Sequence, residues 1–544
     1  MKTFLRKKTA ILLMALFSSA FVFQSCEKIL DDIISILETG WLMDDEDMDN
    51  IPEDITPFED EDDPVVVETK ISLEHLFPPI GDQGQYGTCV AWSVGYNLKT
   101  ALNAIEKGWK TGDLSKTDNQ TSPKDLWMAI PSSKKGANCN GTNFEPALDA
   151  LISSGAASLN SVPYTGLGNC TGTPKGDDKN KLANYRKIAS EKEGLTVANF
   201  KGYLNAGRPI AIGAKLGDRF MKWDNASILS NDTYNNPGMQ HAYHAMVLVG
   251  YDDDKQAFRV RNSWGKDSWG DDGSIWVDYN FFCKSFCFAA FVAQNVNNVG
   301  FGSGGGIIEG DLTSGYDLLA YDAWDIVDPE KGGRNRVFSY DVYNSGTKPI
   351  LPSQNWTVAY LYYNAVNAND YQIIFEDYYT TEFGPGDGYY DESVGLAGGW
   401  WNNYPVASGK KAGEAEYPDG FVITYTMPSI TGKYYLVVMA DAYDVIREAN
   451  EDNNFFFITA DNGKPLDFVN GEISKPPTKS GKIPTPPALF SNTENQTPVK
   501  PGNLNAYTPA EIRAMLLRDK KSGKLDLKMN AARLGGKAGT KVKR

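Results

Sequence analysis

Apolar residues recur at helical and at strand spacing between residues 71 and 298, so this part of the chain predicts a domain of mixed α and β structure. A helix is expected over Thr88–Ile105, where Val90, Val94, Leu98 and Leu102 fall four positions apart. The run FEPALDALI at 144–152 continues the helical pattern. Apolar runs at 209–214, 245–251 and 257–261 predict strands.

Glycine then marks a boundary, and the pattern changes. The stretch FGSGGG at 301–306 predicts a flexible linker (299–310). From about 311 to 467 short alternating runs such as FSYDVY at 338–343 predict an all-β domain. Residues 468–544 are rich in Pro and Lys and are expected to be largely disordered. A short helix at 509–519, capped by Thr508, is the exception.

Length and charge narrow the function class. A chain of 544 residues exceeds one hydrophobic core. The net charge is −16, with acids crowded in the linker at 27–70 and an excess of Lys and Arg confined to the tail. This distribution argues against nucleic acid as a partner. The acidic run is expected to be a solvated spacer.

The first 26 residues have the pattern of an export signal. A basic head (Lys2, Arg6, Lys7, Lys8) precedes an apolar stretch that is too short to span a membrane as a helix and ends at Ser25-Cys26. This resembles a bacterial lipoprotein signal peptide, which implies lipidation of Cys26 and an outer-membrane lipoprotein, either periplasmic or surface-exposed. A plain signal peptide with an incidental cysteine is the alternative.

The remaining cysteines suit an oxidising compartment. The chain has six, and setting aside Cys26 and Cys89 leaves four that could form two disulfides. No pair of Cys-x-x-Cys motifs is present and only three histidines occur. We therefore expect neither a metal site nor a cofactor.

The segment PPIGDQGQYGTCVAW at 78–92 carries a candidate nucleophile. Cys89 would lie in the first turn of a helix, where the helix dipole favours a thiolate. Its backbone N–H and the side-chain amide of Gln83 could both face an oxyanion. The segment resembles the active-site signature of the papain family of cysteine peptidases.

A second pair of segments supports the same resemblance. His244 leads into the apolar strand AMVLVGY, and Asn262-Ser-Trp264-Gly follows. The resemblance implies that His244 is the base, that Asn262 orients its imidazole and that Trp264 shields their hydrogen bond. His241 in HAYHAM is the competing base, and His75 is expected at the surface.

Substrate contacts follow from the resemblance too. Cys139-Asn-Gly141-Thr142 resembles the family's Cys-Asn-Gly-Gly, so Gly141 and Thr142 are expected to pair with substrate backbone, with Thr142 crowding the cleft. Tyr243 and Trp264 complete the expected substrate-binding set. Val162-Pro-Tyr164 resembles the family's Tyr-Pro-Tyr.

The chain departs from the family where Tyr86 and Val90 replace a disulfide cysteine and a tryptophan. Because the family's usual partners are absent, Cys139 is expected to pair with Cys170 and Cys283 with Cys287, although the latter two could be buried thiols. A propeptide of the usual length and charge pattern is not recognised before residue 71.

The fold class implied is a two-lobed α+β papain-like domain followed by an immunoglobulin-like β-sandwich. The run VIREANEDNNFFFI at 445–458 resembles the last hairpin of adhesion-related immunoglobulin-like domains. The expected function is hydrolysis of protein or peptide substrates at the cell envelope. In the alternative, the papain-like fold is a non-catalytic scaffold and the β domain binds a carbohydrate or protein, with Tyr362, Tyr363, Trp400, Trp401 and Tyr404 as candidate stacking residues.

Overall fold

The structure is a computed structural model. The chain forms two compact units. The first contains residues 1–51 and 58–298, and the second contains 52–57 and 299–544. The break after residue 298 coincides with the predicted glycine-rich linker. The structure describes residues 51–54, 68–136, 139–168, 170–190, 194–233, 242–295, 315–328, 331–344, 346–379, 388–389, 422–451, 453–460, 463–474, 505–525 and 532–534.

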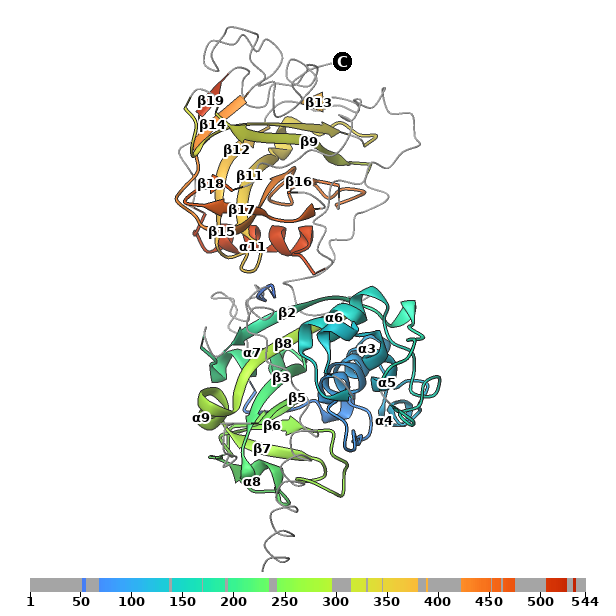
Figure 1. Ribbon diagram of the computed structural model, residues 1–544. Coiled ribbons are helices and arrows are strands. Elements are labelled where there is room, and N and C mark those ends of the chain that lie inside the picture. The colour runs from blue at the N-terminus through green and yellow to red at the C-terminus, as the bar shows by residue number, and fades with distance from the viewer. Residues whose placement is uncertain are drawn as a thin grey trace, which may run out of the picture. The chain divides into compact units, whose positions relative to one another are not determined.

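The first unit is built on one mixed sheet (Figure 1). Its strands run in the order β2-β8-β3-β5-β6-β7-β4, and β1 pairs with β5. The bounds are β1 Lys70–Ser72, β2 Leu182–Ser190, β3 Ile210–Leu216, β4 Ile228–Leu229, β5 Ala242–Asp252, β6 Ala257–Arg261, β7 Ser274–Asp278 and β8 Cys287–Asn295. Strand β5 has ten of its eleven residues buried, which agrees with the continuous apolar run AMVLVGY.

A long helical segment follows Cys89 without a break. It passes through the π-helical stretch η2 (Ala91–Lys99) into α3 (Thr100–Lys107) and ends at Gly108, whose φ of 62° stops the helix. All nine residues of η2 are buried, so the helix lies inside the unit rather than on its surface. The other helices are η1 Glu74–Leu76, α4 Thr111–Leu114, α5 Pro123–Ala129, η3 Ser132–Lys134, α6 Phe144–Ser153, η5 Asp178–Asn180, α7 Val197–Asn205, α8 Asp218–Met221, α9 Tyr279–Phe281 and η6 Phe282–Phe286.

The second unit contains two sheets that share a hydrophobic core. One contains β9 Leu318–Val327, β10 Asn335–Asn344, β13 Gly388–Tyr389, β14 Val422–Thr426 and β19 Ala532–Leu534. The other contains β11 Thr357–Asn364, β12 Tyr371–Tyr378, β15 Gly432–Met439, β16 Phe455–Ile458, β17 Leu466–Val469 and β18 Glu472–Ile473; η7 is Pro352–Gln354. The β-rich prediction is therefore correct, and the immunoglobulin-like assignment stays a prediction.

Two of the candidate stacking residues are core residues instead. Tyr362 and Tyr363 on β11 are 4% and 0% exposed, which leaves no ring face for a ligand. Trp400, Trp401 and Tyr404 lie outside the described residues.

The predicted C-terminal helix is present and belongs to the second unit. Helix α11 (Pro509–Lys521) begins at Thr508, whose hydroxyl accepts from the backbone N–H of Glu511 in a capping box. Its residues Ile512, Met515 and Leu516 are buried in the hydrophobic cluster that covers β11 and β15. The helix predicted at 509–519 is thus confirmed, and its amphipathic face covers an apolar sheet.

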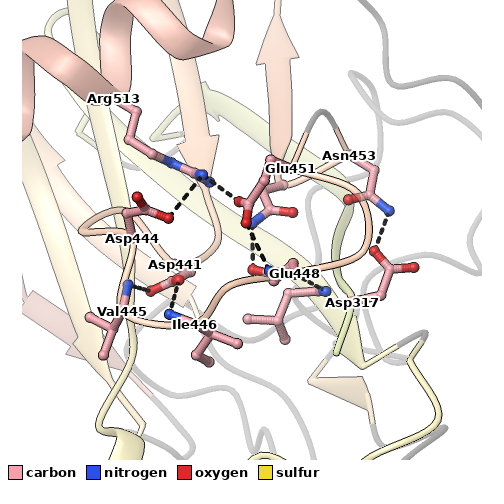
Figure 2. Close-up of polar contacts among 11 residues, drawn as sticks. Asp317, Asp441, Asp444, Val445, Ile446, Glu448, Glu451, Asn453 and Arg513 are labelled. Atoms are coloured by element: carbon pink, nitrogen blue, oxygen red, sulfur yellow. Dashed lines mark hydrogen bonds and ion pairs between the residues drawn. The ribbon is translucent and has the colours of Figure 1, made fainter. Parts of the chain in front are cut away.

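Polar contacts fix the same helix to the loop between β15 and β16 (Figure 2). The Arg513 guanidinium donates to Glu451 at 2.5 Å, and the two side chains are 0% and 3% exposed. In the loop, the carboxylate of Asp441 accepts the backbone N–H groups of Val445 and Ile446. Among the described residues, no cluster of three or more His, Cys, Asp or Glu side chains is placed to hold a metal ion.

A short piece of the acidic linker is also ordered. The backbone N–H of Glu53 donates to Val366 O at 2.6 Å, and the Tyr507 hydroxyl donates to Glu53 O at 2.7 Å. The linker therefore is not a solvated spacer at these residues, because β-unit carbonyl and hydroxyl groups satisfy its backbone. Within the described residues, no helix combines the length and the hydropathy needed to cross a membrane. Cys26 lies outside them.

Candidate active site

Cys89 is the first helical residue after the loop that contains Gln83, and it is 0% exposed. The backbone of Ala245, the residue directly after His244 on β5, forms a hydrogen bond with the Cys89 sulfur. One turn further along the helix, the Ser93 hydroxyl donates to Met246 O at 2.7 Å. Two contacts in register therefore place the start of the helix against the strand that carries the candidate base.

Burial and the helix start act on the ionisation of Cys89 in opposite directions. Burial raises the pKa of the thiol to about 12, whereas backbone hydrogen bonds from Ala245, Val90 and Cys89 itself act to lower it. The thiolate favoured by the helix start stays a prediction.

His244 is paired with Asn262 as predicted. Its Nε2 lies 2.7 Å from the Oδ1 of Asn262, and since that oxygen can only accept, Nε2 carries the hydrogen. Asn262 directly follows β6, and its Oδ1 also accepts from the backbone N–H of Ser263 at 2.8 Å. The ring of Trp264 lies 4.8 Å from the imidazole. Nδ1 is thereby left as the nitrogen that can exchange a proton with a thiol.

The side chain of Gln83 is held from both ends. Its Oε1 accepts from the Ser263 hydroxyl at 2.8 Å, and its Nε2 donates to Tyr86 O at 2.9 Å. Ser263, the residue after Asn262, therefore positions the side chain of Gln83. The sequence analysis missed this role, although the motif Asn-Ser-Trp contained the residue.

Tyr164 is a second residue whose role was missed. Its hydroxyl donates to Gln83 O at 3.0 Å and lies 2.6 Å from the Thr88 hydroxyl. It thus ties together both ends of the loop that the family's usual disulfide would restrain. The position of Tyr164 in a family-like motif was visible, but its contacts depend on the folded loop.

Of the expected substrate-binding residues, Gly141 lies beside the nucleophile loop, whereas Thr142 and Tyr243 are engaged elsewhere. Gly141 donates its N–H to Gly87 O at 3.1 Å, so it lies beside the nucleophile loop. Thr142 is 0% exposed and its hydroxyl donates to Lys134 O, so crowding of the cleft was a wrong expectation. Tyr243 is half-buried against Phe288 and, because strand side chains alternate, faces away from His244.

The cysteine pairing is partly as expected. Cys139 and Cys170 form a disulfide. Cys283 and Cys287 are not joined by a disulfide, so the second predicted pair is wrong. The helical turn η6 ends at Phe286 and Cys287 is extended, with φ −84° and ψ 132°, so the two side chains do not share a helix face.

The other histidines are placed apart from the site. His75 is exposed on η1, as expected. His241 lies outside the described residues, so its competition with His244 is left to experiment.

Part of the first unit is similar to known cysteine proteases. Residues 69–287 match the family model described as papain family cysteine protease. Cathepsin B-like CP1 of Giardia intestinalis is 26% identical over 203 residues, covering 36% of this chain and 61% of that protein. Zingipain-2 of Zingiber officinale is 24% identical over 208 residues, covering 37% and 82%. Among solved structures, xylellain, a cysteine protease from Xylella fastidiosa, has a TM-score of 0.38 and 19% identity, covering 48% and 97%.

These matches support one class for the first unit. Its residues 69–287 are similar to papain-family cysteine proteases, which are hydrolases. The chain spans about three fifths of the length of the first of these relatives. The second unit lies beyond the matched segment.

Proposed function

We propose that this protein hydrolyses peptide bonds with Cys89 as nucleophile, His244 as general base and acid, and Asn262 as the residue that orients the imidazole. The observation that carries the proposal is the hydrogen bond between His244 and Asn262. The residue that follows His244 on β5, Ala245, contacts the Cys89 thiol through its backbone. A buried histidine with a fixed tautomer beside a helix-start cysteine is the arrangement that nucleophilic catalysis requires.

The reaction would proceed in two halves. His244 Nδ1 takes the thiol proton as the Cys89 sulfur attacks the substrate carbonyl carbon, giving a tetrahedral oxyanion. The backbone N–H of Cys89 and the amide of Gln83 donate to that oxygen. The intermediate collapses, the C–N bond breaks, and His244 returns the proton to the leaving amine. Water then attacks the thioester, and a second proton cycle through His244 releases the acid and restores the thiol.

We expect the thiol proton to pass directly to His244 as the sulfur attacks. Burial raises the pKa of the thiol, and the attraction between the thiolate and the imidazolium would offset part of that effect in a low-dielectric site. Trp264 against the imidazole keeps water from competing for its hydrogen bonds.

We also propose that the protein acts at the bacterial cell envelope, held by lipid on Cys26. The support is the sequence of the first 26 residues. Cys26→Ser should move the protein from the membrane to the soluble fraction, since the thioether that carries the acyl chains is lost. Continued sedimentation of the variant with membranes would remove this part of the proposal.

Labelling with a thiol-directed epoxide tests the peptidase proposal directly. We expect one modified residue, Cys89, together with loss of peptide cleavage in Cys89→Ala. Cys283→Ser is the matched control, because Cys283 is also a free thiol and is half-buried. A protein that remains unlabelled at Cys89 and cleaves no peptide from a library would instead favour the non-catalytic scaffold.

A further inference from the structure

A hollow of about 440 Å³ lies beside the nucleophile loop. Its inner wall is aromatic, formed by Trp92, Tyr96 and Tyr164, and its rim includes Asp82, Thr117 and Asn160. The rings of Trp92 and Tyr164 pack edge to face with centroids 4.8 Å apart. The rim residues are exposed, so the hollow opens to solvent.

The hollow shares residues with the surroundings of the active site. Asp82 directly precedes Gln83, and its backbone forms an isolated antiparallel β-bridge with Trp264. The ring of Trp264 packs against His244. Tyr164 holds Gln83 O and Thr88 through its hydroxyl. An extended peptide advances about 3.3 Å per residue, so an occupant of the hollow would belong to a residue a few positions from the scissile bond.

The charge of the hollow is negative and comes from one residue. Asp82 is the only charged residue among the described residues that line it. Its carboxylate lies close enough to contribute to the raised pKa of Tyr164, of which burial is the main cause. The two lysines that flank the rim are engaged elsewhere: Lys116 pairs with Asp113 at 2.9 Å, and Lys124 donates to Thr165 O at 2.6 Å.

We propose that this hollow is a substrate subsite that binds a lysine or arginine side chain. The aliphatic stem would lie along the aromatic wall and the cationic head would meet the Asp82 carboxylate. An apolar side chain would fill the wall but give the carboxylate no opposite charge, so the cation is the better occupant. The inference rests on the proposed peptidase function and specifies its substrate class as peptides with a basic residue near the cut.

Matched peptides test the preference. One substrate carries arginine at successive positions around the cut, and its partner carries citrulline, which has nearly the same shape without the charge. We expect the arginine-to-citrulline ratio of kcat/KM to fall about tenfold in Asp82→Asn. Asparagine keeps the Oδ1 that accepts from the Gly84 N–H at 2.8 Å, so the loop is retained.

Two further variants make the result specific. Asp118→Asn removes an equal charge from an exposed residue that bonds to Asn160 without lining the hollow, and it should leave the ratio within about twofold. Thr117→Glu adds a carboxylate to the rim and should raise the ratio. The Asp82 effect should also shrink at high salt. An unchanged ratio in Asp82→Asn, or an equal fall in Asp118→Asn, overturns the subsite.

Binding separates this inference from the proposed function. The uncleaved arginine peptide should bind Cys89→Ala about tenfold more tightly than Cys89→Ala/Asp82→Asn. Asp82-dependent binding without any cleavage by the wild-type protein would reject the peptidase while keeping the subsite. Cysteine-dependent cleavage with no effect of Asp82 on either measurement would reject the subsite and keep the peptidase.

Discussion

His244 Nε2 and Asn262 Oδ1 lie 2.7 Å apart, and the two side chains are 0% and 1% exposed. The Nδ2 of Asn262 is buried without a hydrogen-bond partner. The Oδ1 of Asn262 is therefore the side-chain atom that orients His244. A hydrogen bond at this place fixes both the tautomer and the ring orientation of the base.

Asn262→Ala should lower kcat/KM by about 10²-fold, because an imidazole free to rotate spends less time facing the thiol. Asn262→Asp keeps an accepting oxygen and should retain more activity. Its negative charge favours the imidazolium, so the acidic limb of the kcat/KM profile should move to higher pH. The pH profiles of both variants give the measurement.

Asn184→Ala is the control for this pair, since Asn184 is also a buried amide on the same sheet, hydrogen-bonded to Gln294. Full activity in Asn262→Ala would show that another group orients the base.

His244→Ala should reduce alkylation of Cys89 by iodoacetamide at pH 7 by about 10³-fold or more. Without the imidazole, burial still raises the pKa of the thiol, so the rate should recover only at alkaline pH. The rate of carboxamidomethylation against pH, measured in a Cys283→Ser background, gives the result.

Exposed His75 supplies the control, and His75→Ala should alkylate like the wild type. His241→Ala should do the same. Loss of reactivity in His241→Ala with retention in His244→Ala would move the base to position 241.

The sequence predicted the parts of this site that local pattern and spacing determine. The helix after Cys89, the strands around 245–251 and 257–261, and the Thr508 cap are all present, because periodicity and capping act within one element. The His244–Asn262 pair came from a recognised motif. What the sequence could not provide depends on contacts between distant segments.

Three cases make that limit concrete. Cys283 and Cys287 were expected to pair because the family's usual partners are absent, and the end of a helical turn separates them. Tyr164 reaches Gln83 across 81 residues. Residues 52–54 were expected to belong to a solvated spacer, whereas the hydrogen-bond partners of Glu53 are Val366 and Tyr507, which lie far away in sequence.

Lys99 provides a prediction of pH-dependent stability. It is 1% exposed, its Nζ donates to Asn103 and Asn295, and burial lowers its pKa from 10.5 to about 7. Glu106 and Asp177 act to raise this pKa, and Lys107 acts to lower it. The unfolded chain then binds more protons than the folded chain between about pH 7 and 10.5, so this group makes the protein more stable as the pH rises through that window.

Lys99→Met should remove this part of the pH dependence. The free energy of unfolding of the wild type relative to Lys99→Met should rise with pH by up to about 1.4 kcal/mol per unit between pH 7 and 10. Urea denaturation of both proteins at several pH values measures the difference. A difference that stays constant with pH would mean that Lys99 keeps an ordinary pKa in the folded protein.

Arg513 and Glu451 form the contact that should decide whether α11 stays docked. Arg513→Met leaves the Glu451 carboxylate buried without its cation, which costs about 3–5 kcal/mol, whereas Arg513→Met/Glu451→Gln removes the charge as well and should recover part of that loss. Hydrogen exchange of the amides at 509–521 in the full chain should therefore be fastest in the single variant. Arg518→Met is the control on the same helix, because Arg518 is partly exposed and its partner Asp519 keeps the Tyr371 hydroxyl as a donor, so the loss should be smaller than in Arg513→Met. If the double variant exchanges as fast as Arg513→Met, the helix is held by the packing of its arginine stem on Phe455 rather than by the ion pair.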